Sequence, residues 1–154
     1  MNAIEILIAD SLADSLSAAT FTGMIQKVRA VRTYVADYTI EDLSSLRVSV
    51  VPGTVEVSNH THGADLFEYE VHVVLGKKLL DDEELDDMVD LRTNIVDAIR
   101  SKSLPVSSPA MPTGVQWFGI TNAVTYDRDQ VTGSRVFLAD ISVTYRRANA
   151  KVTA

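Results

Sequence analysis

The stretch that decides the fold is LFEYEVHVVL, residues 66–75. Its apolar and polar side chains alternate, which is typical of a β-strand that packs one face and leaves the other accessible. The face that we expect to be buried carries Phe67, Tyr69, Val71, Val73 and Leu75. The opposite face carries Glu68, Glu70 and His72. The pattern therefore predicts a strand in a sheet that is covered on one side.

The segment DDEELDDMVDLRTNIVDAIR, residues 81–100, follows closely and predicts an amphipathic helix. The apolar stripe consists of Leu85, Met88, Leu91, Ile95 and Ile99. Asp81 and Glu84 have the spacing of a carboxylate variant of a capping box, and Arg100 lies at the other end. Both placements complement the helix dipole. We therefore interpret the acidic residues here as a solvated helix start rather than a catalytic or calcium-binding cluster.

Upstream of these elements the sequence predicts one helix and two strands. Apolar residues three and four positions apart predict an amphipathic helix over residues 3–18. The valine- and tyrosine-rich segment 24–36 predicts a long strand. Residues 46–51 predict a second strand that stops at the turn signal of Pro52, with only a brief extension beyond it. Residues 59–63 are expected to form a loop.

Downstream of the second helix the sequence predicts an irregular connection and two strands. Residues Ser103–Gly114 are rich in proline and serine, and are expected to form an extended, mobile loop. Strands are predicted over residues 115–126 and 136–146, with a polar hairpin loop at 127–134 between them. The second of these strands has Phe137, Ala139, Ile141, Val143 and Tyr145 on its buried face. Residues 148–154 are expected to fray.

The order helix, strands, helix, two strands predicts an α+β fold. The connections between strands are mostly short, so the sheet is expected to be largely antiparallel with the two main helices on one face. The chain has 154 residues. A chain of that length buries about 70% of the surface that its unfolded form exposes. We therefore predict a single α+β domain spanning residues 1–154.

Charge and composition exclude several classes of function. The chain has 21 acidic and 14 basic side chains, which gives a net charge of -7 and disfavours a nucleic-acid-binding protein. It has no cysteine, so it can form neither a disulfide nor a thiolate site. The acidic start, with no basic residue before Lys27, does not resemble a secretory signal. Because no apolar run approaches about 18 residues, we expect an intracellular protein with no membrane association.

The histidines are the only candidates for a metal site. His60 and His62 have a spacing that could place two imidazoles on one ion, with His72 as a third ligand. The neighbouring Asn59 and Gly63 instead favour a solvated loop. The sequence contains no P-loop, no dinucleotide-binding glycine motif and no nucleophile elbow. We therefore expect neither a cofactor nor an enzymatic activity.

Two further groups of residues have both a functional and an ordinary interpretation. Glu68, Glu70 and His72 could form a catalytic cluster, but polar residues on the open face of a sheet are far commoner. Trp117 and Phe118 lie next to the proline-rich loop and could anchor a partner protein. The strand pattern nevertheless favours a pair of aromatic residues in the core.

The arrangement of segments along almost the whole chain, residues 1–147, resembles a known family. After the first helix, the segments that carry the resemblance are VVPGTVEV (50–57), LFEYEVHVVLGKKL (66–79), DDEELDDMVDLRTNIVDAIR (81–100), a serine- and proline-rich loop, and RVFLADISVTYRR (135–147). Together they resemble the tail terminators and related neck proteins of tailed bacteriophages. These are small α+β subunits that close into a ring, usually a hexamer, at the head-proximal end of the tail tube.

The resemblance implies a structural role in the virion, after assembly in the host cytoplasm. A ring of this kind stops polymerisation of the tail tube protein and docks onto the head connector or adaptor, while genomic DNA passes through without being bound. The residues expected at docking surfaces are Trp117, Asp127, Arg128, Asp129, Gln130, Arg146 and Arg147. The acids expected to face the lumen are Glu68 and Glu70.

Three alternatives stay open at this point. The chain could instead be a head-completion or adaptor protein, or a minor tail protein of the neck, because these share its size and composition. A more distant alternative is a module that binds a small ligand between its sheet and its helices.

Overall fold

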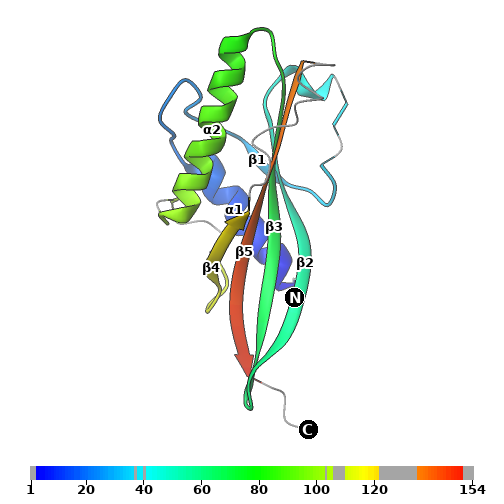
Figure 1. Ribbon diagram of the computed structural model, residues 1–154, viewed down its shortest axis with the longest axis vertical. Helices are drawn as coiled ribbons and strands as arrows, with labels where there is room; N and C mark the ends of the chain where they lie inside the picture. The colour runs from blue at the N-terminus through cyan, green and yellow to red at the C-terminus, as the bar shows by residue number, and fades with distance from the viewer. Residues whose placement is uncertain are drawn as a thin grey trace.

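In the computed structural model, a five-stranded sheet packs against two helices (Figure 1). The structure describes residues 3–36, 38–39, 41–102, 104–105, 110–121 and 135–150. The helices are α1 (Ile4–Ala18), α2 (Asp82–Arg100) and a short 3-10 turn, η1 (Asp42–Ser44). The strands are β1 (Ala30–Arg32), β2 (Arg47–Thr61), β3 (Ala64–Lys78), β4 (Gln116–Thr121) and β5 (Val136–Ala150).

The sheet is mostly antiparallel, as predicted, with the strand order β1-β2-β3-β5-β4. The strand predicted at residues 66–75 lies at the centre as β3, paired with β2 on one side and β5 on the other. The short strand β1 is parallel to β2, and every other pair is antiparallel. The α+β fold predicted from the order of elements is therefore confirmed.

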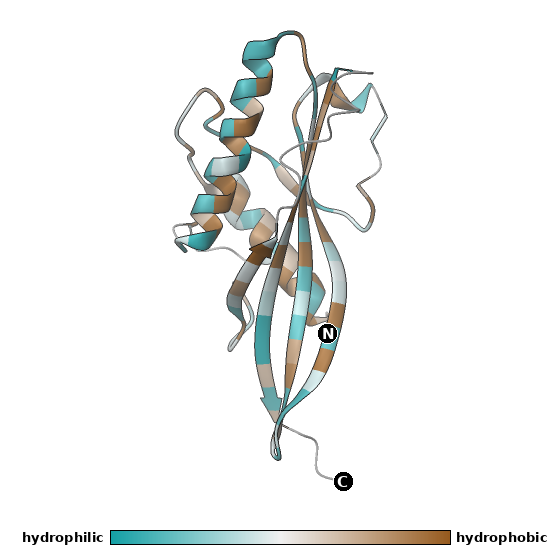
Figure 2. Ribbon diagram, in the orientation of Figure 1, coloured by the Kyte–Doolittle hydropathy of each residue, from teal (hydrophilic) through white to brown (hydrophobic). Residues whose placement is uncertain are grey.

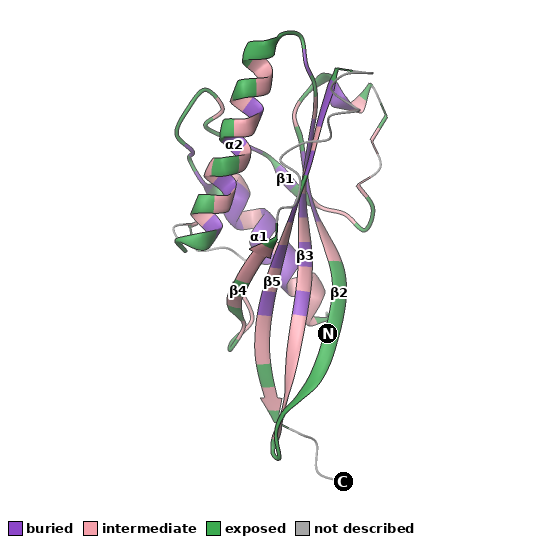
Figure 3. Ribbon diagram, in the orientation of Figure 1, coloured by how far each residue is buried: buried purple, intermediate pink, exposed green. Residues whose placement is uncertain are grey.

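The core lies between the two helices and one face of β3 and β5 (Figure 3). The residues from β3 are Tyr69, Val71, Val73 and Leu75, and those from β5 are Phe137, Ala139, Ile141, Val143 and Tyr145. Helix α1 contributes Ile8, Leu12 and Leu16, and α2 contributes Met88, Leu91, Ile95 and Ile99. The predicted alternation is confirmed except at Phe67, which is only partly buried. Burial of this apolar surface is the main force that holds the helices on the sheet.

The start of α2 has the capping interactions that its sequence predicts, with one difference. The Asp81 carboxylate accepts a hydrogen bond of 2.9 Å from the backbone N–H of Glu84. In return, the Glu84 carboxylate accepts a 2.6 Å hydrogen bond from the backbone N–H of Leu80, not from that of Asp81. Glu84 also pairs with Lys77 at 3.1 Å. The Leu80 hydrogen bond, and then Lys77, lower the pKa of the Glu84 carboxyl.

Among the described residues, those that cover the opposite face of the sheet lie near η1. Leu43 is buried there, and a Cβ added at Gly76 would lie 2.8 Å from its Cδ2 atom. The side chain of Tyr38 hydrogen-bonds to Ser49, which is buried on this face of β2. Glycine at position 76 therefore allows the η1 segment to lie close against the sheet, and the rest of this face stays accessible.

For three segments in the first half of the chain, the predicted bounds of the strand or loop were wrong. Of the long strand predicted at residues 24–36, only β1 forms, because its only partner is three residues of β2. Strand β2 does not stop at Pro52 but continues to Thr61, with a register shift between Pro52 and Val55. An edge strand tolerates proline at such an irregularity, because no ladder hydrogen bond is lost there. The loop predicted at 59–63 is reduced to a tight turn between β2 and β3.

The C-terminal predictions also need correction. The strand predicted at residues 115–126 is described only as β4, over Gln116–Thr121. Residues 148–150 do not fray, because they pair with residues 64–66 of the unexpectedly long β3. The described residues of the 103–114 connection form neither helix nor strand. The predicted hairpin loop 127–134 and the final residues 151–154 lie outside the described residues.

Strands β2, β3 and β5 continue past the helices and β4 to the turn between β2 and β3 (Figure 1). We call the half of the sheet nearest this turn the blade; it comprises residues 54–61 of β2, 64–70 of β3 and 144–150 of β5, and β4 pairs with residues 144–146 at its start. Its strands carry a mixture of apolar and polar residues, which alternate over residues 54–58 of β2 (Figure 2). Among the described residues, no helix is long and apolar enough to cross a membrane. Much of the blade and the open face of the sheet are surfaces that the helices leave uncovered (Figure 3).

Candidate functional site

The outer edge of β2 is unpaired along the blade. Strand β1 pairs only with Val48–Val50 of β2, and no described strand pairs with this edge beyond that point. Every residue from 53 to 61 is exposed. Two of these are apolar: Val55 is 39% exposed and Val57 is 56% exposed. The edge therefore offers free backbone N–H and C=O groups beside apolar side chains.

Natural proteins usually protect such edges with charges, prolines or bulges, because an unpaired edge recruits other strands. Here Pro52 and one register shift lie at the start of the free edge, and a second register shift lies at its far end, between Asn59 and Thr61. Among residues 53–61, Glu56 is the only acidic side chain and there is no lysine or arginine. Most of the edge is thus open to pairing with another strand.

An apolar strip lies on the helix-side face of the blade, next to this edge. Val55 is paired in register with Tyr69, and Val57 with Phe67. The rings of Phe67 and Tyr69 are stacked, with centroids 6.1 Å apart and planes at 15°. The side chain of Tyr69 is buried in the core, whereas Val55 and Val57 are exposed. The strip therefore extends the core outward to the unpaired edge.

The opposite face of the blade carries an ion pair between β3 and β5. Glu68 and Arg146 are register partners, and their side chains form a salt bridge of 2.8 Å. The Arg146 guanidinium carbon also lies 3.1 Å from the centroid of the Phe118 ring. Such a cation–π contact is favourable because the ring face is electron-rich. Arg146 is thus held between Glu68 and an aromatic ring that is 54% exposed.

His72 lies farther along the same face, between two carboxylates. Its Nε2 atom is 2.5 Å from a Glu70 oxygen, and its Nδ1 atom is 2.8 Å from an Asp140 oxygen. Burial lowers the pKa of His72, but the Asp140 hydrogen bond and charge, together with Glu70, outweigh it, so the net shift is upward. The two carboxylates thus favour the protonated imidazole, which in that form offsets part of the negative charge on this face.

The predicted site residues are divided between the two faces of the sheet. Glu68 and Glu70 share the open face, as predicted, but each has a cationic or titratable partner. Arg146 lies on that face as well. Trp117 is partly buried opposite Tyr145, on the helix side, and Arg147 lies near Gly114 on that side. The structure thus separates Arg146 from Arg147, which the sequence analysis had grouped together.

The remaining predicted docking residues cannot be placed. Asp127, Arg128, Asp129 and Gln130 lie outside the described residues. For the histidines, the structure places His60 on β2 and His62 in the turn that follows, whereas His72 lies well along β3. The described part of the chain contains no group of three histidine or carboxylate side chains arranged to hold a metal ion.

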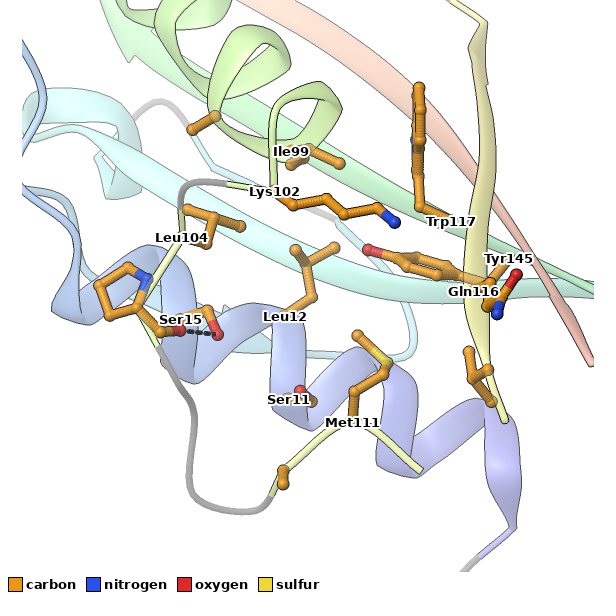
Figure 4. Close-up of a pocket in the computed structure, with 14 residues that line it drawn as sticks. Ser11, Leu12, Ser15, Ile99, Lys102, Leu104, Met111, Gln116, Trp117 and Tyr145 are labelled. Atoms are coloured by element: carbon orange, nitrogen blue, oxygen red, sulfur yellow. Dashed lines mark hydrogen bonds between the residues drawn. The ribbon is translucent and has the colours of Figure 1, made fainter. Parts of the chain in front are cut away.

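A pocket that the sequence analysis missed lies between α1, the end of α2, and strands β4 and β5 (Figure 4). Its volume is about 460 Å³. Trp117 and Tyr145 form part of its wall. Within the described part of the chain, the buried Nε1 of Trp117 has no hydrogen-bond partner. The sequence offered one signal for this pocket, namely aromatic residues at Trp117 and Tyr145 in the last two predicted strands. Aromatic residues in such positions indicate an ordinary core just as well.

Comparisons with protein-family models and with curated proteins find no match to this chain. The resemblance to phage neck proteins therefore rests on the order and pattern of the sequence segments. The function of the chain has to be inferred from its surfaces: the unpaired β2 edge with its apolar strip, the open face of β3 and β5, and the pocket.

Proposed function

We propose that this chain is a structural virion protein of a tailed bacteriophage, similar to the tail terminators. Its subunits assemble into a ring, expected to be a hexamer, at the head-proximal end of the tail tube. The ring ends polymerisation of the tail tube protein and docks the tail to the head connector. The observation that carries this proposal is the unpaired β2 edge, with Val55 and Val57 exposed beside it.

The β2 edge suits assembly between copies because strand addition satisfies its backbone groups and covers its apolar strip at the same time. A contact between two different surfaces of the same subunit is heterologous, and a heterologous contact closes into a ring when its rotation allows. In this proposal the edge and strip of one subunit meet a different surface of the next subunit. The β2 edge of the blade, which is unpaired in the isolated chain, would thereby gain a pairing partner in the ring.

The charge of the chain supports a ring through which DNA passes without being held. The net charge is -7, and like charge repels the phosphates of DNA. We propose that the open face with Glu68 and Glu70 faces the lumen. The salt bridge of Glu68 to Arg146 and the contact of Glu70 with His72 make this face mildly rather than strongly acidic. A ring with a strongly basic lumen would contradict this part of the proposal.

The first experiment measures the oligomeric state of the purified chain by native mass spectrometry and negative-stain imaging. We expect rings for the unchanged protein. Val57→Lys places a charge on the free edge, which is how natural edges are blocked, and should prevent ring formation. Val35→Lys is the matched control, because Val35 is 72% exposed and lies outside the edge. Rings formed equally by both variants would exclude the β2 edge as the contact.

A second experiment separates a tail terminator from a head-completion, adaptor or minor tail protein of the neck. The gene is disrupted in its phage, and the particles are examined by electron microscopy. Loss of a terminator should give abnormally long tail tubes. Loss of a head-completion protein should instead give tails of normal length beside unjoined, leaking heads, and this result would replace the terminator proposal by the adaptor alternative.

A further inference from the structure

The pocket beneath the helices has the size and lining of a small-molecule site. Its volume of about 460 Å³ lies within the range of about 300–1,000 Å³ that is usual for ligand pockets. Its apolar lining includes Leu12 of α1, Ile99 of α2, Leu104 and Met111 of the connection, and Trp117 of β4. The Ser15 hydroxyl donates a 2.9 Å hydrogen bond to the Pro105 carbonyl, which ties the described part of the connecting segment to α1 (Figure 4).

Tyr145 supplies a polar group inside this apolar lining. The residue is only 5% exposed, and its hydroxyl points into the pocket, towards the space between Leu12 and Lys102 (Figure 4). No described residue forms a hydrogen bond with this hydroxyl. Burial raises the pKa of Tyr145 well above its usual range, so the hydroxyl keeps its proton at neutral pH. The hydroxyl opens onto the pocket, so it is available as a donor to an acceptor on a bound ligand.

Charge selects the kind of ligand. The chain has 21 acidic side chains, yet none of them lines the pocket, and the only charged residue there is Lys102. The Lys102 ammonium forms no ion pair with any described residue. It extends across the pocket towards Tyr145 (Figure 4). Lysine only donates hydrogen bonds, and the tyrosine hydroxyl can donate another. Two donors of this kind, directed towards each other within an apolar cavity, match an anionic acceptor attached to an apolar body (Figure 4).

We propose that the pocket binds a small amphiphilic carboxylate, with its headgroup at Lys102 and Tyr145 and its hydrocarbon body against Leu12, Ile99 and Trp117. A medium-chain fatty acid has this chemistry. The inference goes beyond the proposed ring, because no residue of β2 lines the pocket. Failure of carboxylate binding would therefore leave the ring proposal intact, and failure of ring formation would leave this inference intact.

Trp117 makes the proposal directly testable, because it is the only tryptophan in the chain. Decanoate is titrated into the full chain below its micelle concentration, and Trp117 fluorescence is recorded. We expect a saturable change. Decanol has a similar body without the charge, and should bind about tenfold more weakly, since a hydrogen bond to a charged group contributes more than one to a neutral group. No saturable change, or equal affinity for decanol, would overturn the proposal.

Variants then test the two headgroup contacts. Tyr145→Phe keeps the ring and removes the hydroxyl, and should weaken decanoate binding about tenfold. Lys102→Gln removes the charge at an exposed position, so it should leave the fold unchanged while weakening binding about threefold to tenfold. Lys78→Gln is the matched control, because it removes the same charge from an exposed residue at the far end of β3.

Circular dichroism confirms that each variant is folded before binding is compared. The result that overturns the assignment of the headgroup site is the same decanoate affinity for Lys102→Gln as for Lys78→Gln. Because the Lys102 comparison does not disturb the core, it decides the question even if Tyr145→Phe alters the packing.

Discussion

Two valines of the same sheet should differ greatly in how much stability the chain loses when each is truncated to alanine. Val73, at the centre of β3, is fully buried, and its register partners Val50 on β2 and Ile141 on β5 are fully buried as well. Val57, on the free edge of β2, is 56% exposed. The sequence places both residues in alternating segments, so only the structure distinguishes them. We predict that Val73→Ala is strongly destabilising and that Val57→Ala is nearly neutral for the isolated chain.

The size of the difference follows from what each substitution removes. Val→Ala deletes two methyl-sized groups, which is worth about 1.6 kcal/mol of lost transfer free energy at a fully buried position. The cavity left among Val50, Ile141 and the helices adds to this, giving about 2–3 kcal/mol for Val73→Ala. At Val57 the side chain is already largely hydrated and leaves no cavity. Its truncation should cost less than about 0.5 kcal/mol.

The assay is urea unfolding followed by Trp117 fluorescence and circular dichroism. It is performed at a concentration where native mass spectrometry shows a monomer, so that assembly does not add to the free energy of unfolding. For a chain of this length, the loss at Val73 corresponds to a fall in Tm of about 4–12 °C. If both variants lost the same free energy of unfolding in the monomer, Val57 could not be exposed on the β2 edge. A loss at Val57 that appears only at high concentration would instead support the edge as an intersubunit contact.

Three further predictions concern single side chains. Asp81→Ala removes the carboxylate that caps α2, and should lower the free energy of unfolding by about 1 kcal/mol in a urea titration. Gly53→Ala should cost about 1–3 kcal/mol, because the new Cβ would lie 2.9 Å from a backbone oxygen of β3 and 3.1 Å from the His72 ring. Gly63→Ala, with nothing within 4 Å, is its control and should be nearly neutral. For His72, the raised pKa means that its contribution to stability is present below the ordinary value of 6.5 and is lost as the pH rises through the folded-state value. The stability difference between the wild type and His72→Gln should therefore shrink as the pH rises above 6.5, and a constant difference would contradict the two carboxylate contacts.

Local periodicity was enough to predict the central strand and the second helix. Both β3 and α2 have an apolar repeat that matches one type of element, and α2 also has the cap at Asp81. Periodicity cannot say where a strand finds a partner. Residues 24–29 have strand-like composition but form no strand, because only residues 30–32 meet β2. Residues 148–150 look like a tail but pair with the start of β3.

The candidate sites were less predictable than the fold, because they depend on contacts between distant segments. Glu68 and Glu70 could be assigned to the open face from alternation alone. The pairing of Glu68 with Arg146 depends on the register of β3 with β5, which the sequence does not reveal. The pocket requires α1, the end of α2 and β5 to converge on Trp117. Each of its walls looks like ordinary core when it is considered alone.

The position of β5 also determines how the chain can reach its folded state. This strand is the last in chain order, yet it lies between β3 and β4 in the sheet. It pairs residue 136 with residue 78 and residue 150 with residue 64, so these contacts close long loops. Folds dominated by such non-local pairing fold slowly, on the order of milliseconds to seconds. Until β5 arrives, the β5-facing edge of β3 and the outer edge of β2 beyond its pairing with β1 are unpaired, and a newly made chain is most exposed to aggregation during that interval.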